Sequence, residues 1–525
     1  MATEHTGTPP NTAMTGAEAV IRTAAAAGID VCFANPGTTE LYLVEALDRC
    51  PQIRSVLSVF EGVCTGAADG YTRITGRPAL ALLHLGPGLA NGLANLHNAR
   101  KANSPVVSVV GEHATWHIAA DAPLTSDIAT LAQPMAHFVK TPTRVEEAAA
   151  DMAEVIARAT QRPSGPGTLI LPGDMQWAKV SQPLPQPVLS QPAPSQPEAV
   201  ERAARALSRP GAALVLGGSA LRAAGLRAAD RIAQATGCKV LAPTFPPVQD
   251  RGRGLMCPDK IPYAPEPARQ VLEPYKTLVL AGAAKPVAFF GYPDNRSGLY
   301  AEDAELLEVC GAEADPAAAV IALAEALDAP PERQAPTPDR PAPPGGPLTP
   351  RHMCQAVAAL QPDNAIVMDE GATAGFGYYP MAAGAPPFTY MALTGGSIGQ
   401  GLPCAAGAAA AAPDRPVVCL EGDGSSLYTI QALWTMAREK HNVTAVICKN
   451  RAYSILRWEL ERAKITPGEA SLSLTGLDSP VFDFVKLAEG FGVEARAVWT
   501  AEELNDALGY GFGSPGPMLI EANLE

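Results

Sequence analysis

The sequence predicts an α/β chain built from three doubly wound parallel-sheet domains. Short apolar runs end at glycine-containing turns and are followed by helical stretches, which is typical of parallel sheets covered by helices. Two Pro-rich stretches, 181–197 and 329–350, divide the chain and predict extended linkers. At 525 residues, the chain is long enough for three domains of ordinary size. We therefore expect domains at residues 1–180, 198–328 and 345–525.

The composition excludes several classes of function. The chain has 39 basic and 53 acidic residues, and its net charge of −14 argues against binding to nucleic acids or anionic membranes. No uncharged apolar run approaches the ~20 residues of a membrane-spanning helix, and residues 1–15 lack the apolar segment of a secretory signal. The ten cysteines include no C-x-x-C pair, so we expect free thiols in a reducing compartment. Together these features predict a cytoplasmic protein.

Two segments of the first domain each contain one ionisable residue with catalytic potential. Glu61 precedes small residues at helical spacing, so it is expected to lie in the first turn of a helix. His84 ends the apolar strand 79–83 and opens a glycine-rich loop. A carboxyl group in a dry pocket can share a proton with a ring nitrogen, and histidine titrates near neutral pH. Both residues are candidate catalytic groups.

The middle domain has the pattern of a six-stranded α/β unit. The strand 212–216 leads into Gly217-Gly218, and the helical stretch 223–236 and strands at 240–242 and 277–280 follow. No G-x-G-x-x-G with a downstream acid accompanies this glycine turn. We therefore do not expect flavin or nicotinamide binding here.

In the last domain, two predicted strands end at polar residues. The apolar run 416–420 leads into E-G-D-G-S at 421–425, a helix is predicted over 427–440, and the strand 443–448 leads to Asn450. The carboxyl ends of strands in one open sheet form a ligand-binding edge. Asp423 and Asn450, together with phosphate oxygens and water, suit Mg²⁺. The glycine-flanked turn and the helix N-terminus beyond it suit phosphate groups.

The 27-residue step from Asp423 to Asn450 resembles the signature of thiamine diphosphate (ThDP) enzymes. In those enzymes an Asp, an Asn and a backbone carbonyl two residues later hold the magnesium ion. The resemblance implies that Ala452 supplies this carbonyl. It also implies cofactor contacts from Gly422, Gly424, Ser425 and Tyr453.

The segment 59–73 resembles the pyrimidine-binding segment of the same family, loosely at Cys64 and closely at 68–71. This resemblance implies that Glu61 hydrogen-bonds N1′ of the aminopyrimidine and assists removal of the proton from thiazolium C2. The three domains would then be a pyrimidine-binding, a central and a diphosphate-binding domain of the ThDP decarboxylase/synthase type.

Two further segments resemble parts of the ThDP site. The glycine-rich segment 394–403 implies that Gly396 offers its carbonyl to the 4′-amino group. It also implies that Ile398 is the apolar wedge beneath the bent cofactor. The strand-end segment 369–373 resembles the one that touches the diphosphate, which implies a contact from Thr373.

Within this family, the chain most resembles benzoylformate decarboxylase and acetolactate-synthase-like proteins. The turn N-P-G-T-T-E at 35–40 implies that Thr38 orients the substrate carboxylate, although a simple turn role stays open. The loop L-H-L-G-P-G at 83–88 implies that His84 faces the cofactor. The second catalytic histidine of the decarboxylase has no counterpart in the stretch 285–292.

Two candidate pocket residues follow the Asn450 site. Ile455 and Glu459 are four residues apart on a predicted helix and share a face, which the resemblance places over the thiazolium. A branched side chain and a carboxylate there favour small aliphatic 2-oxo acids over benzoylformate. Alternatively, Glu459 turns outward and pairs with Arg462 or Arg457.

The resemblance implies a ThDP- and Mg²⁺-dependent enzyme that decarboxylates 2-oxo acids without oxidation, with carboligation as a possible second activity. One alternative is an acetolactate-synthase-type carboligase, and another is a non-catalytic ThDP-binding homologue. The intact Glu61, Asp423 and Asn450 argue against the non-catalytic reading. The family further implies a homodimer or homotetramer with its active site at a subunit interface. We do not expect FAD to be required.

Overall fold

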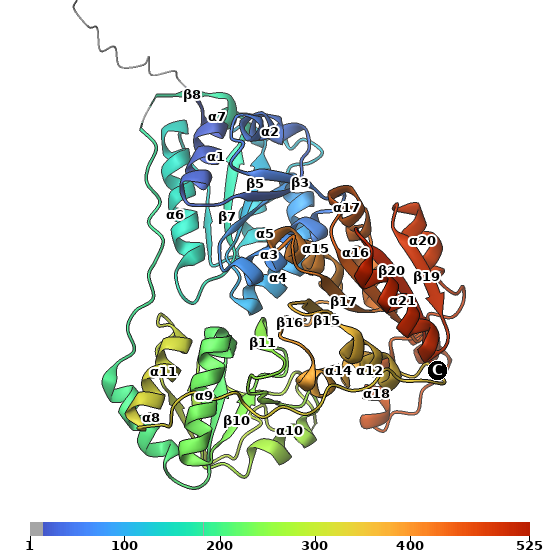
Figure 1. The fold of residues 1–525 in the computed structure, drawn as a ribbon. Helices are drawn as coiled ribbons and strands as arrows, with labels where there is room; N and C mark the ends of the chain where they lie inside the picture. The colour runs from blue at the N-terminus through green and yellow to red at the C-terminus, as the bar shows by residue number, and fades with distance from the viewer. Residues whose placement is uncertain (1–13, 182, 294) are drawn as a thin grey trace, which may run out of the picture. The chain divides into compact units, whose positions relative to one another are not determined.

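The computed structural model describes residues 14–181, 183–293 and 295–525, which form two compact units (Figure 1). The first unit holds residues 14–72 and 76–190, and the second holds 73–75 and 191–525. Each unit contains parallel sheets covered by helices, so the predicted α/β class is confirmed. Among the described residues, no helix is long and apolar enough to cross a membrane.

The first unit is built on a six-stranded parallel sheet in the order β3-β2-β4-β5-β7-β6. Helices α1, α2 and α6 pack on one face of this sheet, and α3, α4 and α5 lie on the other (Figure 1). The strands are β2 (Val31–Asn35), β3 (Arg54–Leu57), β4 (Ala79–Leu83), β5 (Val106–Glu112), β6 (Phe138–Lys140) and β7 (Gly167–Pro172), with a small antiparallel pair of β1 (Met14–Thr15) and β8 (Lys179–Val180). The helices are α1 (Gly16–Ala26), α2 (Leu41–Asp48), α3 (Glu61–Thr75), α4 (Leu85–Ala102), α5 (Ile128–Ala132), α6 (Ala148–Thr160) and α7 (Gly173–Trp177), with 3₁₀ turns η1 (Thr38–Glu40), η2 (Ile118–Ala120) and η3 (Val145–Glu147).

The second unit begins with a five-stranded parallel sheet, one strand fewer than the sequence pattern predicts. Its order is β12-β10-β9-β13-β14, with α8, α9 and α11 on one face and α10 on the other. The strands are β9 (Ala212–Leu216), β10 (Lys239–Ala242), β12 (Asp259–Lys260), β13 (Thr277–Ala281) and β14 (Glu305–Glu308). The helices are α8 (Pro197–Leu207), α9 (Ala223–Thr236), α10 (Pro265–Leu272) and α11 (Pro316–Ala326), with the 3₁₀ turn η4 (Gly218–Leu221).

A seven-stranded sheet follows, in the order β11-β16-β15-β17-β18-β20-β19. Six of its strands are parallel, whereas β11 (Gln249–Arg251) comes from the middle of the chain and pairs antiparallel with β16. The other strands are β15 (Ile366–Glu370), β16 (Phe388–Ala392), β17 (Val417–Gly422), β18 (Val443–Lys449), β19 (Glu494–Val498) and β20 (Met518–Asn523). The helices are α12 (Pro350–Leu360), α13 (Ala372–Gly375), α14 (Tyr378–Met381), α15 (Gly401–Ala411), α16 (Asp423–Thr429), α17 (Ala432–Glu439), α18 (Ser454–Arg462), α19 (Glu469–Thr475), α20 (Phe484–Gly490) and α21 (Ala501–Gly513), with the 3₁₀ turn η5 (Ala382–Gly384).

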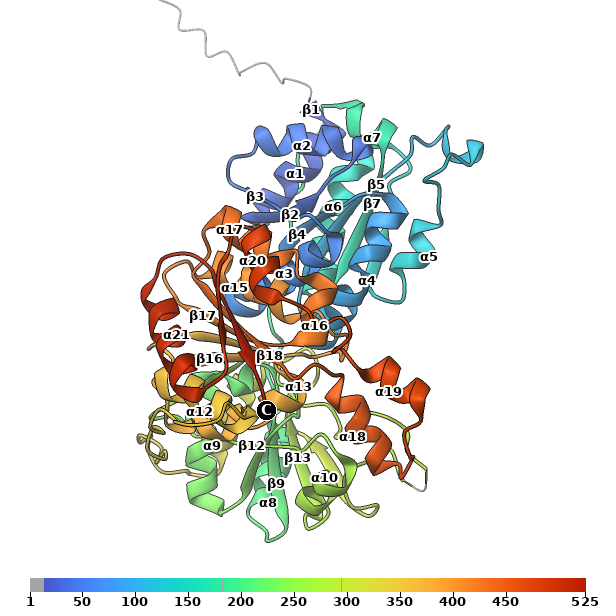
Figure 2. The same cartoon turned by 90° about the vertical axis from the view of Figure 1, so that its right-hand side faces the viewer.

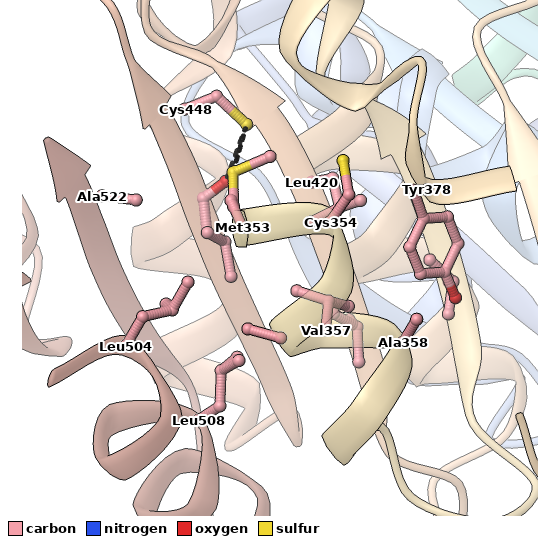
Figure 3. Packing of buried hydrophobic residues seen from close by; sticks show 14 of the residues in the cluster. Met353, Cys354, Val357, Ala358, Tyr378, Leu420, Cys448, Leu504, Leu508 and Ala522 are labelled. Carbon is pink, nitrogen blue, oxygen red and sulfur yellow. Dashed lines mark hydrogen bonds between the residues drawn. The ribbon is translucent and has the colours of Figure 1, made fainter. Parts of the chain in front are cut away.

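Local sequence signals fix several helix starts. Thr349 caps α12 by accepting a hydrogen bond from His352 N, and Pro350 occupies the first helical position. Thr500 and Glu503 form a reciprocal capping box at the start of α21. These two helices pack side by side on one face of the seven-stranded sheet. Figure 3 shows Met353 and Val357 of α12 beside Leu504 and Leu508 of α21.

The helix expected over 427–440 is interrupted. The structure has two helices there, α16 and α17, separated at Ile430 and Gln431. Helix α16 starts directly at Asp423, four residues earlier than the apolar pattern suggested. The strand that precedes it therefore leads into the helix without an intervening loop.

The ten cysteines are all free, as the sequence predicted. Eight are buried, and Cys238 and Cys257 are partly exposed. Cys448 donates a hydrogen bond to the sulfur of Met353 (3.4 Å; Figure 3), and both side chains belong to the buried core.

Burial of Lys260 should make the free energy of unfolding of the second unit vary with pH in the alkaline range. Its ammonium group lies 4.8 Å from the ring centroid of Tyr379, and loss of hydration lowers the pKa of Lys260 from 10.5 to about 8. Between these values the unfolded chain binds a proton that the folded chain does not, so stability rises with pH across this window. We expect the urea midpoint of wild type to rise between pH 7.5 and 9.5 more than that of Lys260→Met. The exposed Lys285→Met is the control, and an equal rise in all three proteins would contradict this assignment.

Candidate functional site

Glu61 is the first residue of α3 in the first unit and is 8% exposed. Its Oε2 accepts a hydrogen bond from Asn91 Nδ2 at 2.9 Å. Its Oε1 lies on the side of Gly88, where an added Cβ would be only 3.0 Å away. One carboxyl oxygen is therefore held by a neighbour, and the other lies beside Gly88, where a larger residue would be tightly packed.

His84 follows β4 and faces a buried carboxyl group. Its Nδ1 is 2.7 Å from Oε2 of Glu40, which is fully buried. Glu40 also accepts hydrogen bonds from Gly37 N (2.8 Å) and from the Thr39 hydroxyl (2.6 Å). Because a carboxylate only accepts, Nδ1–H of His84 is the donor, and Nε2 is left to take up or release a proton.

The structure brings Glu61 and His84 together around Gly88. A Cβ at Gly88 would lie 3.0 Å from Glu61 Oε1 and 3.3 Å from Cβ of His84. A Cβ at Gly37 would collide with the His84 ring. The glycines of both predicted loops therefore leave room for the two candidate catalytic side chains.

Thr38 is exposed and begins η1. The hydroxyl beside His84 belongs instead to the next residue, Thr39, at 3.3 Å from Nδ1. Sequence reasoning gave no role to Glu40 or Asn91. A role for Asn91 could have been predicted from the sequence, because helical spacing places it on the same face as His84, seven residues earlier, and Gly88, three residues earlier. The burial of Glu40 has no sequence signal, because acidic residues are ordinarily exposed.

In the second unit, Asp423 lies at the junction of β17 and α16 and is 4% exposed. Arg451 N donates to its Oδ2 at 2.6 Å and Gly424 N donates to its Oδ1 at 2.9 Å. Burial raises the pKa of Asp423, since desolvation disfavours the ionised form. A cation at this position would stabilise the carboxylate.

Asn450 follows β18, the neighbour of β17 in the sheet. Its Oδ1 accepts a hydrogen bond from Ala452 N at 3.0 Å, and Arg451 between them has a left-handed φ of 61°. The bond from Arg451 N to Asp423 ties this turn to the carboxylate. The predicted metal ligands Asp423, Asn450 and Ala452 therefore belong to one hydrogen-bonded cluster.

This donor set fits Mg²⁺ of the kind that shares its coordination sphere with phosphate and water. It offers one carboxylate, one amide oxygen and backbone carbonyls. The described part of the chain contains no cluster of three His, Cys, Asp or Glu side chains that could cage an ion. The remaining ligands of an ion here would come from a bound diphosphate and water.

Four of the residues expected at the cofactor, Gly422, Gly424, Ser425 and Tyr453, lie next to this cluster in the chain. The Tyr453 ring packs so closely on Gly424 that a Cβ there would collide with it. The Ser425 hydroxyl donates to Glu421 and to the Gly422 carbonyl (3.1 Å). Thr373 lies in α13 and is partly buried.

Sequence reasoning missed two buried carboxyl groups beneath the glycine-rich segment. Glu370, at the end of β15, accepts hydrogen bonds from Gly399 N (2.7 Å) and Gly401 N. Burial raises its pKa to about 7. Glu421 lies opposite it on β17, and burial raises its pKa as well. Glu370 therefore fastens the segment that contains Gly396 and Ile398.

Gly396 has a left-handed φ of 75°, which glycine adopts without strain. Its Cα lies against an aromatic ring from the middle of the chain, so that an added Cβ would be 2.5 Å from Cζ of Phe289. Ile398 is partly buried in the same segment. Gly396 thus occupies a position that needs both the conformation and the small size of glycine.

The candidate pocket residues Ile455 and Glu459 are partly buried on α18. Arg462 Nε donates to Oε2 of Glu459 at 2.9 Å, which is one of the two pairings that the sequence left open. Arg457 is occupied elsewhere, where its Nε donates to the Thr475 hydroxyl. The structure thus pairs Glu459 within α18.

Comparisons with known proteins match two segments of the chain to one enzyme family. Residues 14–136 match the family model of the thiamine pyrophosphate enzyme N-terminal TPP binding domain, and residues 373–522 match that of the C-terminal TPP binding domain. A Mycobacterium tuberculosis protein provisionally named acetolactate synthase large subunit IlvX is 48% identical, with 97% of this chain and 98% of the relative covered.

Two decarboxylases are also similar along nearly the whole chain. Benzoylformate decarboxylase of Pseudomonas aeruginosa is 30% identical over 94% of this chain and 96% of its own. The solved structure of a thiamine diphosphate-dependent 4-hydroxybenzoylformate decarboxylase from Rhodococcus jostii RHA1 superposes with a TM-score of 0.84. The two sequences are 27% identical, and the match covers 98% of this chain and 100% of the solved chain.

Proposed function

Because the chain belongs to the thiamine pyrophosphate enzyme family, we propose that it uses ThDP and Mg²⁺ to decarboxylate 2-oxo acids without oxidation. The observation that supports decarboxylation best is His84, held by buried Glu40 beside Glu61. This arrangement leaves Nε2 of His84 available to deliver a proton to the product carbon.

When bound, ThDP supplies the electron sink that allows a 2-oxo acid to lose carbon dioxide. Glu61, held at Oε2 by Asn91, has Oε1 free to hold a proton at the aminopyrimidine nitrogen. Asp423, Asn450 and the Ala452 carbonyl would hold Mg²⁺ against the diphosphate. Glu370 keeps the segment of Gly396 and Ile398 in place.

A second candidate is carboligation of the acetolactate-synthase type. The 48% identity to the mycobacterial relative of that name favours it. The two candidates differ in the acceptor of the activated acyl group, which is a proton in the first and a second 2-oxo acid in the second.

A product assay separates the two candidates. The protein, supplied with ThDP and Mg²⁺, is incubated with pyruvate, benzoylformate and a branched 2-oxo acid, and carbon dioxide, aldehydes, acyloins and acetohydroxy acids are measured. Aldehyde in equal amount to carbon dioxide supports decarboxylation, whereas acetohydroxy acid supports synthase activity. Cofactor binding without any product would support a non-catalytic homologue.

We also propose a homodimer or homotetramer whose active site lies at a subunit interface. Glu61 and Asp423 belong to different units, and each unit carries only one set of candidate cofactor residues. We expect activity in the cytoplasm, in keeping with ten free cysteines, and without added FAD.

A further inference from the structure

Five aromatic side chains gather in the second unit and are called here the aromatic wall: Tyr263, Phe289, Phe290, Phe376 and Trp458. Neighbouring ring centroids are 5.0 to 6.4 Å apart. Three rings are unusually open to solvent, since Phe289 is 41%, Phe290 53% and Phe376 46% exposed. Rings of this size favour burial, so their exposure on one cluster indicates a binding surface.

The aromatic wall borders the position where the reaction is proposed to occur. The Phe289 ring lies directly against Gly396, the residue expected to contact the aminopyrimidine. Phe376 follows α13, which contains Thr373, and Trp458 belongs to α18, which follows the Asn450 turn. Two rings of the wall, Phe376 and Trp458, therefore lie on segments that continue candidate cofactor residues, and Phe289 contacts a third such segment at Gly396.

Glu459 is hydrogen-bonded to Tyr263 of the aromatic wall and to Tyr292, which is two residues from Phe290. Its Oε1 accepts hydrogen bonds from the hydroxyls of Tyr292 (3.1 Å) and Tyr263 (3.3 Å), and its Oε2 accepts from Arg462. Burial raises the pKa of both tyrosines, so their hydroxyls stay protonated and donate.

Arg462 completes this link. Its guanidinium stacks at 3.6 Å from the ring centroid of Tyr292 and pairs with Glu266 of α10 at 3.2 Å. Helix α18 is thereby joined to α10, which lies in the same part of the molecule (Figure 2), and to Tyr292 in the segment that carries Phe289.

We propose that Phe289 selects 2-oxo acids with large apolar side chains, and that Glu459 is the positioning residue that holds the aromatic wall in place. The proposal rests on the proposed 2-oxo acid activity. A flat apolar side chain would cover the exposed rings, whereas the methyl group of pyruvate is too small to do so. The carboxyl group of Glu459 is occupied by three donors, so it need not repel an aryl group. The proposal therefore replaces the expectation, drawn from Ile455 and Glu459 in the sequence, that small aliphatic 2-oxo acids are preferred.

The first test compares Phe289→Ala with wild type and with Val287→Ala, an exposed control in the same segment. The readout is the ratio of kcat/KM for benzoylformate to that for pyruvate. We expect wild type to favour benzoylformate and Phe289→Ala to lower the ratio about 10-fold or more, because a single methylene in an apolar pocket is already discriminated by roughly 10- to 200-fold. An unchanged ratio in Phe289→Ala, or a preference of wild type for pyruvate, would overturn the proposal.

A binding measurement separates this proposal from the proposed function. Mandelate and lactate have the same two side chains but no ketone group, and their binding is followed by tryptophan fluorescence, with Trp458→Phe showing which part of the signal comes from the aromatic wall. We expect wild type to bind mandelate more tightly than lactate, and Phe289→Ala to lose the difference. If neither benzoylformate nor pyruvate is turned over while this difference holds, the proposed reaction fails but the aromatic wall stands. Equal binding of mandelate and lactate by wild type would refute the proposed role of the aromatic wall in substrate selection.

The second test concerns Glu459. A pocket-lining role and a positioning role predict opposite changes in the benzoylformate-to-pyruvate ratio of Glu459→Ala. If its carboxylate lined the pocket, Glu459→Ala would raise the benzoylformate preference. As a positioning residue, its loss should lower that preference, as in Phe289→Ala, without changing ThDP affinity. Glu459→Gln keeps one oxygen that can accept from the tyrosines and should retain most of the wild-type ratio, and the exposed Glu461→Ala on the same helix should have no effect. A raised ratio in Glu459→Ala would exclude the positioning role.

Discussion

Asp423→Ala is expected to lose Mg²⁺-dependent ThDP binding and all turnover while the fold persists. The carboxylate is buried, receives two backbone N–H groups and has no ion-pair partner among the described residues. Replacing groups that merely orient a metal ligand costs 10- to 100-fold in affinity. Loss of the ligand itself should therefore weaken cofactor binding by at least about 100-fold.

The measurement is a fluorescence titration with ThDP at fixed Mg²⁺, with circular dichroism to check the fold. Asp423→Asn keeps the shape of the side chain but removes its charge, so it should bind nearly as poorly as Asp423→Ala. The exposed Asp506→Ala serves as the control. Wild-type affinity in Asp423→Ala would show that the metal lies elsewhere.

Glu61→Gln should bind ThDP but lose activity by roughly 10²- to 10⁴-fold, the range expected of a general acid–base group. The amide fits the same space and can still accept from Asn91, so the local structure should be preserved. An amide cannot supply or accept the proton that the reaction requires.

Hydrogen–deuterium exchange at C2 of bound ThDP, followed by proton NMR after acid quench, tests this step without substrate. We expect exchange to slow in Glu61→Gln and to stay at the wild-type rate in Glu45→Gln, whose side chain pairs with Arg49 on the surface. Normal exchange together with lost turnover would place the role of Glu61 later in the reaction.

The ends of the strands were the most predictable part of the molecule. Asp423 and Asn450 each follow an apolar run, and parallel strands bring such ends to one edge. The helical face of α18 was likewise evident from its spacing, although the direction of Glu459 was not. That direction depends on Tyr263 and Tyr292, which are more than 160 residues away in the sequence.

Other features had no local signal at all. The burial of Glu40 depends on β5, where a Cβ at Gly111 would collide with its carboxyl group. The break between α16 and α17 leaves apolar residues on both sides, so periodicity does not show it. Glu370 and Glu421 look like ordinary acidic residues until the sheet register places them side by side.

Strand β11 is synthesised long before β16, the strand with which it pairs. Residues 249–251 leave the ribosome well before β16, to which they are hydrogen-bonded in the finished protein. Arg251 is almost fully buried, with its guanidinium 3.5 Å from the ring centroid of Tyr379, so it too must await later residues. The nascent middle segment therefore carries an unpaired strand and an unburied cation until the last third of the chain emerges. A chain started at residue 345 would instead leave the edge of β16 open, and open edges favour aggregation.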